Sequence, residues 1–239
     1  MTGTKITASF VDKTVIVTGS NTGIGYEAAL KYTELGASKV ILSIRNNEKG
    51  QRAKNAIEEK TQRKGLVEVW KIDIDRYESI VEFASRVDRE LPRVDIAFLN
   101  AGVLAKDYSV SLEGWEKMMQ INLLSTALLT ILLLDKLKAS KAKTTSAHLT
   151  IIASTGHKDI KPKASEKDQM LHSHNTGKGY SMMNQCSLSK LFMMWMTREL
   201  AARCIAPNGG PEVIINDTTA LVAARRMSTA TLTIPSSKP

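Results

Sequence analysis

Short runs of apolar residues alternate with longer amphipathic stretches along most of the chain. The short runs are rich in Val, Ile and Leu, and we expect each to form a strand buried on both faces: residues 14–18, 39–44, 67–72, 94–99, 148–152 and 212–215. Between them, apolar residues recur at spacings of three and four, which predicts helices over residues 24–35, 47–61, 77–90, 112–138 and 187–204. The alternation predicts the α/β class, with one doubly wound parallel sheet in a single domain over residues 1–239.

Two segments break this alternation. Residues 156–184 form a long polar stretch, and loops of such length inside compact domains usually carry function or lack order. We interpret this stretch as a substrate-side loop that could act as a lid. From Asn216 onward the chain is rich in Thr, Ser and Ala without a strand pattern, so we expect an irregular, poorly ordered tail over residues 217–239.

Charge and cysteine content narrow the classes of partner. The 239 residues carry a formal net charge of +9, which attracts anionic ligands such as phosphorylated cofactors. No aromatic residues interleave with the basic ones, so we expect no nucleic-acid partner. Cys186 and Cys204 match no metal or C-x-x-C spacing, and His172 and His174 lack further ligands, so no metal site is predicted. The apolar run 121–134 is too short to span a bilayer, and we expect a cytoplasmic protein without membrane insertion.

The strongest motif is the sequence TGSNTGIG at residues 18–25, between the first predicted strand and the first predicted helix. Glycines in such a turn permit close backbone approach, and the free N–H groups of the helix hold a pyrophosphate. The strand before the turn and the helix after it supply the required context. The motif therefore predicts a dinucleotide site in a Rossmann fold.

The end of the second predicted strand indicates which dinucleotide. An enzyme that uses NAD needs a carboxylate there for the ribose hydroxyls, but residues 43–47 read SIRNN, with Lys49 close by. A guanidinium can pair with a 2′-phosphate through two hydrogen bonds. Arg45 therefore favours NADP(H) over NAD(H).

Taken in order, these residues resemble the short-chain dehydrogenase/reductase family over residues 12–216. The glycine turn fits the family pattern T-G-x-x-x-G-x-G. Asp73 resembles the family's adenine contact, residues 100–102 (Asn-Ala-Gly) its N-A-G motif, and Asn122 the asparagine of its long central helix. The insertion at 156–184 and the sequence SLSKL at 187–191 resemble the branch of retinol-dehydrogenase-like enzymes and fungal biosynthetic reductases.

The resemblance implies a set of cofactor contacts in the turn, after the second, third and fourth strands, and on the last long helix. They are Gly19, Ser20, Asn21, Thr22, Gly23, Ile24, Gly25, Arg45, Asn46, Asp73, Ile74, Asn100, Ala101, Gly102 and Lys190.

The family's active site is a tetrad of Asn, Ser, Tyr and Lys, with the last two written Y-x-x-x-K. By resemblance, Asn122 holds a proton-relay water, Ser154 binds the substrate carbonyl, and Lys190 binds the ribose and lowers the pKa of the tyrosine. Four residues before Lys190, where the family has Tyr, stands Cys186. A spacing of four places these two residues on the same face of a helix.

Cysteine is a poor replacement for a proton-donating tyrosine. The thiol is shorter and a weak donor, and beside an ammonium it can ionise. The loss of a positioned general acid costs about 10²- to 10⁴-fold in rate. Three interpretations stay open: Tyr180 folds inward to supply the proton, Cys186 acts as a nucleophile, or Cys186 is an inert buried thiol.

A second departure follows the sixth predicted strand. The resemblance implies a P-G turn, a helix and a seventh strand there, but residues 215–221 read INDTTAL. We therefore expect the last edge strand to be missing, as in a truncated or alternatively spliced product or a diverged relative.

The sequence thus predicts an NADP(H)-dependent oxidoreductase. It would act on a carbonyl or alcohol of a small, largely apolar metabolite, in secondary-metabolite biosynthesis. The alternative is a catalytically impaired family member that binds NADPH without redox turnover, or templates a non-redox reaction. Pairing of the two longest helices in relatives implies a homodimer.

Overall fold

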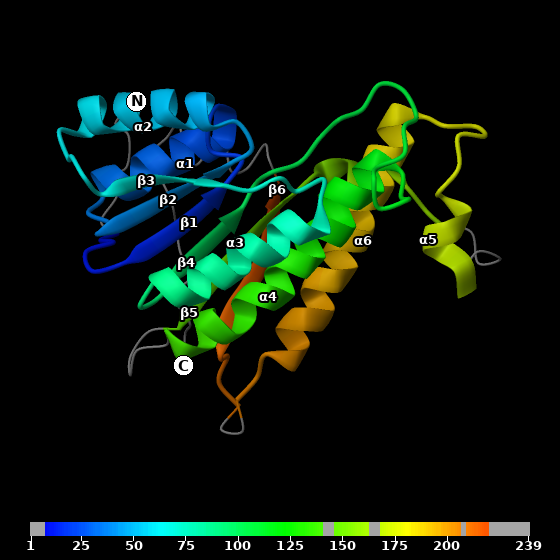
Figure 1. Ribbon diagram of the computed structural model, residues 1–239. Coiled ribbons are helices and arrows are strands. Elements are labelled where there is room, and N and C mark those ends of the chain that lie inside the picture. The colour runs from blue at the N-terminus through cyan, green and yellow to red at the C-terminus, as the bar shows by residue number, and fades with distance from the viewer. Residues whose placement is uncertain (1–7, 141–145, 163–167, 207–208, 220–239) are drawn as a thin grey trace, which may run out of the picture.

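The computed structural model describes residues 8–140, 146–162, 168–206 and 209–219. Six parallel strands form one sheet in the order β3-β2-β1-β4-β5-β6 (Figure 1). Their bounds are β1 Thr14–Thr18, β2 Lys39–Ile44, β3 Val67–Lys71, β4 Ile96–Leu99, β5 Ala147–Ala153 and β6 Val213–Thr219. The predicted doubly wound α/β class is confirmed.

Helices cover both faces of this sheet. They are α1 Gly23–Glu34, α2 Asn47–Thr61, α3 Tyr77–Glu90, the π-helix η1 Met119–Ser125 that continues as α4 Thr126–Ala139, the 3₁₀-helix η2 Thr155–Asp159, α5 Met170–Ser173 and α6 Met182–Arg203. Successive strand residues point to opposite faces, so Val15 and Val17 pack with α1 and α2, whereas Ile16 packs on the side of α3, α4 and α6 (Figure 1). Two apolar cores result, one on each face.

Two predicted helix starts are wrong, because a turn and a helix cap set them and the spacing of apolar residues does not. The helix predicted from residue 112 begins at Met119, because Val110 and Glu116 pair across a turn in which the N–H of Ser111 donates to the Trp115 carbonyl (2.8 Å). The last long helix begins at Met182 instead of residue 187, and the Ser181 hydroxyl caps it. The predicted loop 156–184 therefore contains η2, α5 and the first turn of α6.

The tail prediction is wrong for residues 217–219. Strand β6 runs to Thr219 and pairs with β5 as far as Ala153. The sequence Asn-Asp-Thr-Thr hides this strand, because it lies at an outer position of the described sheet and is only partly buried. The expected irregular tail beyond 219 and the expected loss of a seventh strand concern residues outside the described ranges.

The apolar helix Met119–Ala139 is longer than the run considered in the sequence. It has 21 residues, its most apolar window has a mean hydropathy of 1.4, and it is long and apolar enough to cross a membrane by length and composition alone. However, 56% of its most apolar window is buried inside the protein, and Leu129, Leu133 and Leu137 lie in the core. Core helices commonly have this length and composition.

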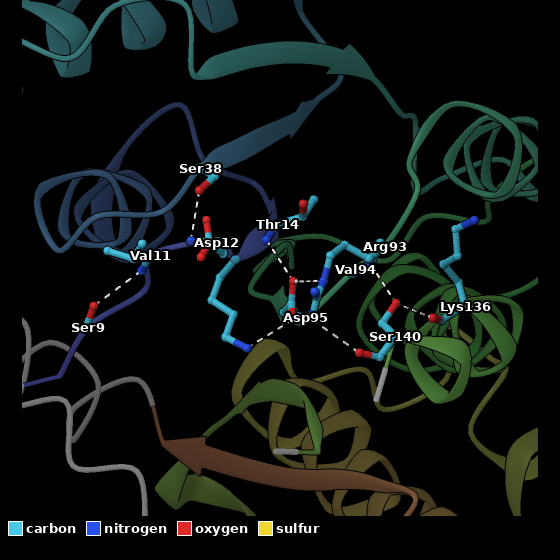
Figure 2. A network of polar contacts seen from close by, with 11 residues as sticks. Ser9, Val11, Asp12, Thr14, Ser38, Arg93, Val94, Asp95, Lys136 and Ser140 are labelled. Atoms are coloured by element: carbon cyan, nitrogen blue, oxygen red, sulfur yellow. Dashed lines mark hydrogen bonds and ion pairs between the residues drawn. The ribbon is translucent and has the colours of Figure 1, made fainter. Parts of the chain in front are cut away.

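A polar network joins the amino ends of the central strands (Figure 2). The buried Asp95 carboxylate accepts from the N–H of Thr14 (2.9 Å), from Lys13 Nζ (3.3 Å) and from the Arg93 guanidinium. Beside it, the Ser140 hydroxyl at the end of α4 accepts from the Val94 N–H (2.8 Å). These contacts tie β1, β4 and α4 together at the end of the sheet opposite the glycine turn.

Candidate active site

The glycine turn stands between β1 and α1, as predicted, and its backbone is tightly packed. Gly19 and Gly23 have φ of +63° and +59°, values that favour glycine. A Cβ on Gly25 would lie 2.5 Å from the Gly19 carbonyl oxygen and 2.6 Å from Asn100 Nδ2. Asn100 Nδ2 in turn donates to the carbonyls of Thr18 and Gly19 (both 3.2 Å). Asn100 therefore fixes the turn rather than reaching into the open space in front of it.

A cleft of about 220 Å³ opens at the carboxyl ends of β1, β2 and β3, the edge where open α/β sheets bind ligands. Its lining includes these predicted cofactor residues: Gly19, Asn21, Arg45, Asn46, Asp73, Ile74, Ala101 and Gly102. Other predicted contacts are not part of the lining: Ser20, Thr22, Gly23, Ile24, Gly25, Asn100 and Lys190. Ser20 is fully buried, and its hydroxyl donates to the Val17 carbonyl (2.9 Å).

Sequence reasoning missed several residues of the cleft: Ser43, Ile44, Ile72, Asp75, Val103 and Ile121. Two of them carry buried polar atoms, Ser43 Oγ and Asp75 Oδ1, that have no hydrogen-bond partner within the described ranges. The other oxygen of Asp75 pairs with Lys117 (3.1 Å). Because buried polar atoms are almost always satisfied, these two fit a cleft that holds a polar ligand.

Arg45 and Asn46 follow β2 at the rim of this cleft. The Asn46 side chain caps α2 by accepting from the N–H of Lys49 (2.9 Å). Arg45 is exposed and forms no ion pair with any described residue. Its guanidinium is thus available to an anion, whereas the Asn46 side chain is already engaged.

Asn122 lies in η1 and is nearly fully buried. Its Oδ1 accepts from the Val103 N–H (2.8 Å), and its Nδ2 donates to the Val103 carbonyl (3.0 Å) and to Ser189 Oγ (3.3 Å). Its side chain therefore joins the segment after β4 to α6. The π-helical turn that carries it is a feature often found at functional sites.

Lys190 reaches from α6 to the end of β5. Its Nζ donates to the Ile152 carbonyl (2.7 Å), and burial lowers the pKa of Lys190 below its ordinary value. A Cβ on Gly102 would lie 3.7 Å from Lys190 Nζ, so the amine stands beside the Asn-Ala-Gly segment that lines the cleft.

Ser154 follows β5 and caps η2, where its hydroxyl accepts from the Gly156 N–H (3.3 Å). His157 Nδ1 contacts the Ser154 carbonyl oxygen. A Cβ on Gly156 would lie 2.6 Å from Ser187 Oγ and 3.6 Å from Ser154 Oγ. Ser154 therefore lies close to Ser187 on α6. Ser187 directly follows Cys186 in the sequence.

Cys186 is half-buried on α6, one turn before Lys190. Burial raises the pKa of the Cys186 thiol, and the positive charge of Lys190 opposes this with a smaller effect. The thiol therefore stays protonated at neutral pH, which does not favour the nucleophilic thiolate considered from the sequence.

The hydroxyl of Tyr180 is engaged with the backbone and is not free to donate a proton to a substrate. Its hydroxyl donates to the Ala105 carbonyl (2.8 Å), and its ring packs edge-on against Tyr108, with centroids 5.8 Å apart. Burial raises the pKa of Tyr180 above its ordinary value. This hydrogen bond holds the phenol against the segment after β4, so it argues against a role for Tyr180 in place of residue 186.

A second cavity, of about 390 Å³, lies between the substrate-side loop and α6. Its lining is Ile160, Lys161, Pro162, Ser173, His174, Thr176, Lys178, Gly179, Tyr180, Ser181, Asn184, Gln185 and Leu188. The α6 residues of this lining, Asn184, Gln185 and Leu188, lie on a different face of the helix from Cys186 and Lys190.

Comparison with known proteins assigns the fold to a family. The model of the short chain dehydrogenase family matches residues 13–162. The chain belongs to the short-chain dehydrogenase family. The resemblance predicted from its motifs is thereby confirmed, and members of this family are oxidoreductases that bind a nicotinamide cofactor.

Two fungal relatives are similar over most of the chain. The short-chain dehydrogenase/reductase phmF of Phaeosphaeria nodorum is 39% identical over 213 residues, which are 88% of this chain and 62% of that protein. The short-chain dehydrogenase/reductase ffsI of Aspergillus flavipes is 40% identical with the same two coverages. The chain thus spans about three fifths of the length of these relatives.

Solved structures give the same family. A putative short chain dehydrogenase from Escherichia coli CFT073 in complex with NADPH superimposes with a TM-score of 0.64 at 25% identity, over 87% of this chain and 77% of that one. The protein from Shigella flexneri in complex with NADP gives the same values.

Proposed function

We propose that this chain is an NADP(H)-dependent oxidoreductase that moves a hydride between nicotinamide and a carbonyl or alcohol of a small metabolite. The observation that carries this proposal is the cleft beyond β1–β3, where the glycine turn, the free guanidinium of Arg45 and two unsatisfied polar atoms converge. The NADP and NADPH complexes of structural neighbours and the fungal relatives support it. A role in secondary-metabolite biosynthesis is part of the proposal.

The residues present fit such a cofactor. The N–H groups of the glycine turn and of the first turn of α1 would hold the pyrophosphate, and Arg45 would pair with the 2′-phosphate. Asp73 and Ile74 would bind the adenine end, and the Asn-Ala-Gly segment would lie along the cofactor. When bound, the nicotinamide supplies the hydride.

The chain's own residues would orient the substrate and manage the proton. Ser154 would donate a hydrogen bond to the substrate carbonyl, Lys190 would bind the ribose, and Asn122 would hold a relay water. The Cys186 thiol is a weak donor, so the proton of the product alcohol would come from water. This substitution predicts slow turnover compared with a site that has tyrosine at this position.

A second candidate function is favoured by the states of Cys186 and Tyr180. With a protonated thiol at residue 186 and Tyr180 bonded to Ala105, the described residues offer no strong acid placed like the family tyrosine. The chain would then bind NADPH without redox turnover, or template a non-redox reaction.

The substrate, partners and location belong to the proposal as well. The proposed substrate is a largely apolar metabolite. The polar cavity beside α6 could hold oxygen substituents of such a molecule. Exposed Ile131 and Leu132 on α4 and Trp195 on α6 support a homodimer. A single domain over residues 1–239, a cytoplasmic location and the lack of a nucleic-acid partner remain proposals.

The test is titration of the protein with NADPH and NADH, followed by fluorescence, in the wild type and in Arg45→Ala. We expect NADPH to bind more tightly than NADH, and the substitution to weaken NADPH binding by about tenfold or more, since a hydrogen-bonded charge pair is lost. Arg52→Ala, on the exposed face of α2, is the matched control. Equal affinity for both cofactors, or no binding, would refute the NADP(H) proposal.

A further inference from the structure

The fully buried carboxylate of Glu116 has no counterpart in the site described so far. It precedes η1 and is 0% exposed. Glu116 Oε1 accepts from the Met118 N–H (2.9 Å), and Oε2 accepts from the Met119 N–H (2.9 Å). No lysine or arginine of the described ranges pairs with it. A buried charge of this kind is tolerated only when N–H groups and a helix amino end compensate it, as they do here.

The carboxylate also reaches α6. Glu116 Oε2 accepts from Gln185 Nε2 (2.8 Å), and the same Nε2 donates to the His174 carbonyl (3.2 Å) of the substrate-side loop. Gln185 directly precedes Cys186. One carboxylate oxygen therefore connects the amino end of the helix that bears Asn122 with the turn of α6 that bears residue 186.

Asn175 closes the arrangement from the loop. Its Oδ1 accepts from the backbone N–H of Glu116 (2.6 Å), and its Nδ2 donates to the Gly114 carbonyl (3.0 Å). The neighbouring His172 ring packs against Trp115, with centroids 5.1 Å apart. We call Glu116, Gln185 and Asn175 the Glu116 clamp.

We propose that Glu116 is a positioning residue, which sets the catalytic face of α6 against the Asn122 helix and anchors residues 174 and 175 of the substrate-side loop beside them. The proposal deepens the proposed function and rests on it for the role of residue 186, but the clamp itself can be tested without turnover. The stretch considered from the sequence as a lid is thus anchored at residues 174 and 175 through two side-chain amides.

The clamp depends on acceptors, which makes it sensitive to a nearly isosteric change. The carboxylate of Glu116 accepts three hydrogen bonds, two from backbone N–H groups and one from the Gln185 side chain. In Glu116→Gln one acceptor oxygen becomes an NH₂ group that faces another donor, so a buried donor loses its partner. Exchanging the two side chains, in Glu116→Gln with Gln185→Glu, restores one amide-to-carboxylate hydrogen bond between helices, but not the bond to His174.

The experiment measures the rate at which iodoacetamide alkylates Cys186, with buried Cys204 as the internal reference, by mass spectrometry of the two peptides. We expect Glu116→Gln to raise the ratio of the Cys186 rate to the Cys204 rate about tenfold, as expected for the loss of one buried hydrogen bond. The exchange variant should recover only the part of the wild-type ratio that the bond between the two helices contributes, because the new carboxylate at position 185 would face the His174 carbonyl. Glu113→Gln is the matched control, because Glu113 accepts from the Tyr77 N–H at the start of α3 (2.8 Å) and not from α6.

If Glu116→Gln fails to fold, both cysteines react together, and Asn175→Ser then decides, because it releases only the loop anchor. It should raise the Cys186 ratio about threefold while Cys204 stays protected. An unchanged ratio in the folded variants Glu116→Gln and Asn175→Ser would overturn the proposal. Since alkylation needs no cofactor, failure of NADPH binding in the wild type would refute the proposed function and leave this test intact.

Discussion

The cofactor half and the catalytic half of this molecule use their polar groups differently. Around β1–β3, the glycine turn is packed by backbone contacts, and polar atoms such as Ser43 Oγ and the Arg45 guanidinium remain without protein partners in the described structure. Around α6, the side chains of Asn122, Tyr180 and Glu116 are bonded to the protein itself. The first half leaves polar atoms open to a ligand, whereas these three side chains of the second half are held by the protein, and Cys186 stands where the family has its acid.

This difference separates binding from chemistry. Binding of a dinucleotide relies on backbone N–H groups and a few glycines close together in sequence, so a substitution elsewhere in the site leaves it intact. Proton transfer relies on one side chain in one place, and a single substitution removes it. If so, a substitution in one half should leave the other unchanged.

The largest expected effect is a gain in turnover from Cys186→Tyr. A phenol one turn before Lys190 would stand on the face where the lysine stabilises a phenolate, so we expect carbonyl reduction with NADPH to rise about 10²- to 10⁴-fold. The measurement is NADPH oxidation at 340 nm with a panel of aromatic ketones and quinones. Cys186→Phe, which adds the ring without the hydroxyl, should show no gain. A folded, NADPH-binding Cys186→Tyr protein without gain would favour the non-redox candidate.

Gly25→Ala should damage the other half alone. The added Cβ would meet the Gly19 carbonyl oxygen and Asn100 Nδ2 well inside contact distance, so the turn must shift. We expect NADPH affinity to fall on the order of 100-fold, about 2.7 kcal/mol. Glu27→Ala, at an exposed position on the same helix, should bind NADPH like the wild type. Retained affinity in Gly25→Ala would mean that the turn does not hold the pyrophosphate.

Asp95→Ala should lower stability without touching either half of the site. Its network lies at the amino ends of the strands, and its removal leaves the Thr14 N–H buried without an acceptor (Figure 2). We expect a loss of about 2 kcal/mol, or about 4–8 °C in Tm for a domain of this size. Calorimetry of the protein measures this. Asp95→Asn keeps an acceptor for Thr14 and should lose less, while NADPH affinity should stay unchanged in both variants.

Sequence reasoning was most accurate where the local pattern determines the structure. The strands at 14–18 and 39–44 and the helices at 47–61 and 77–90 agree with the observed bounds, because buried strands and amphipathic helices carry their signal within a few residues. The start of η1 and the start of α6 were missed. The first follows a local turn closed by the pairing of Val110 with Glu116, and the second a cap from Ser181, and the periodicity of apolar residues reveals neither.

The candidate site divides in the same way. The glycine turn and the Asn-Ala-Gly segment are contiguous motifs, and the sequence places them at the cleft. Asp75 and Ser43 line it only because β2 and β3 end at the same edge of the sheet. The Glu116 clamp joins residues up to 69 positions apart through amide groups, and amide contacts of this kind have no sequence signature.

The smallest expected effect is the pH dependence of stability contributed by His148 on β5. Burial lowers the pKa of His148, and the charge of Lys13 adds to this, so the folded protein keeps the ring neutral where the unfolded chain, with a pKa near 6.5, takes up a proton. The unfolded state therefore binds more protons as pH falls through that value, and stability is lost on the acid side. We expect Tm to decline between pH 7 and pH 5 less steeply in His148→Gln than in the wild type, whereas His172→Gln, on the exposed loop, should keep the wild-type slope. Equal slopes in all three proteins would show that His148 is protonated as easily in the fold as in the unfolded chain. Because His148 lies at the amino end of β5, and neither histidine lines the cleft, NADPH affinity should not change with either substitution.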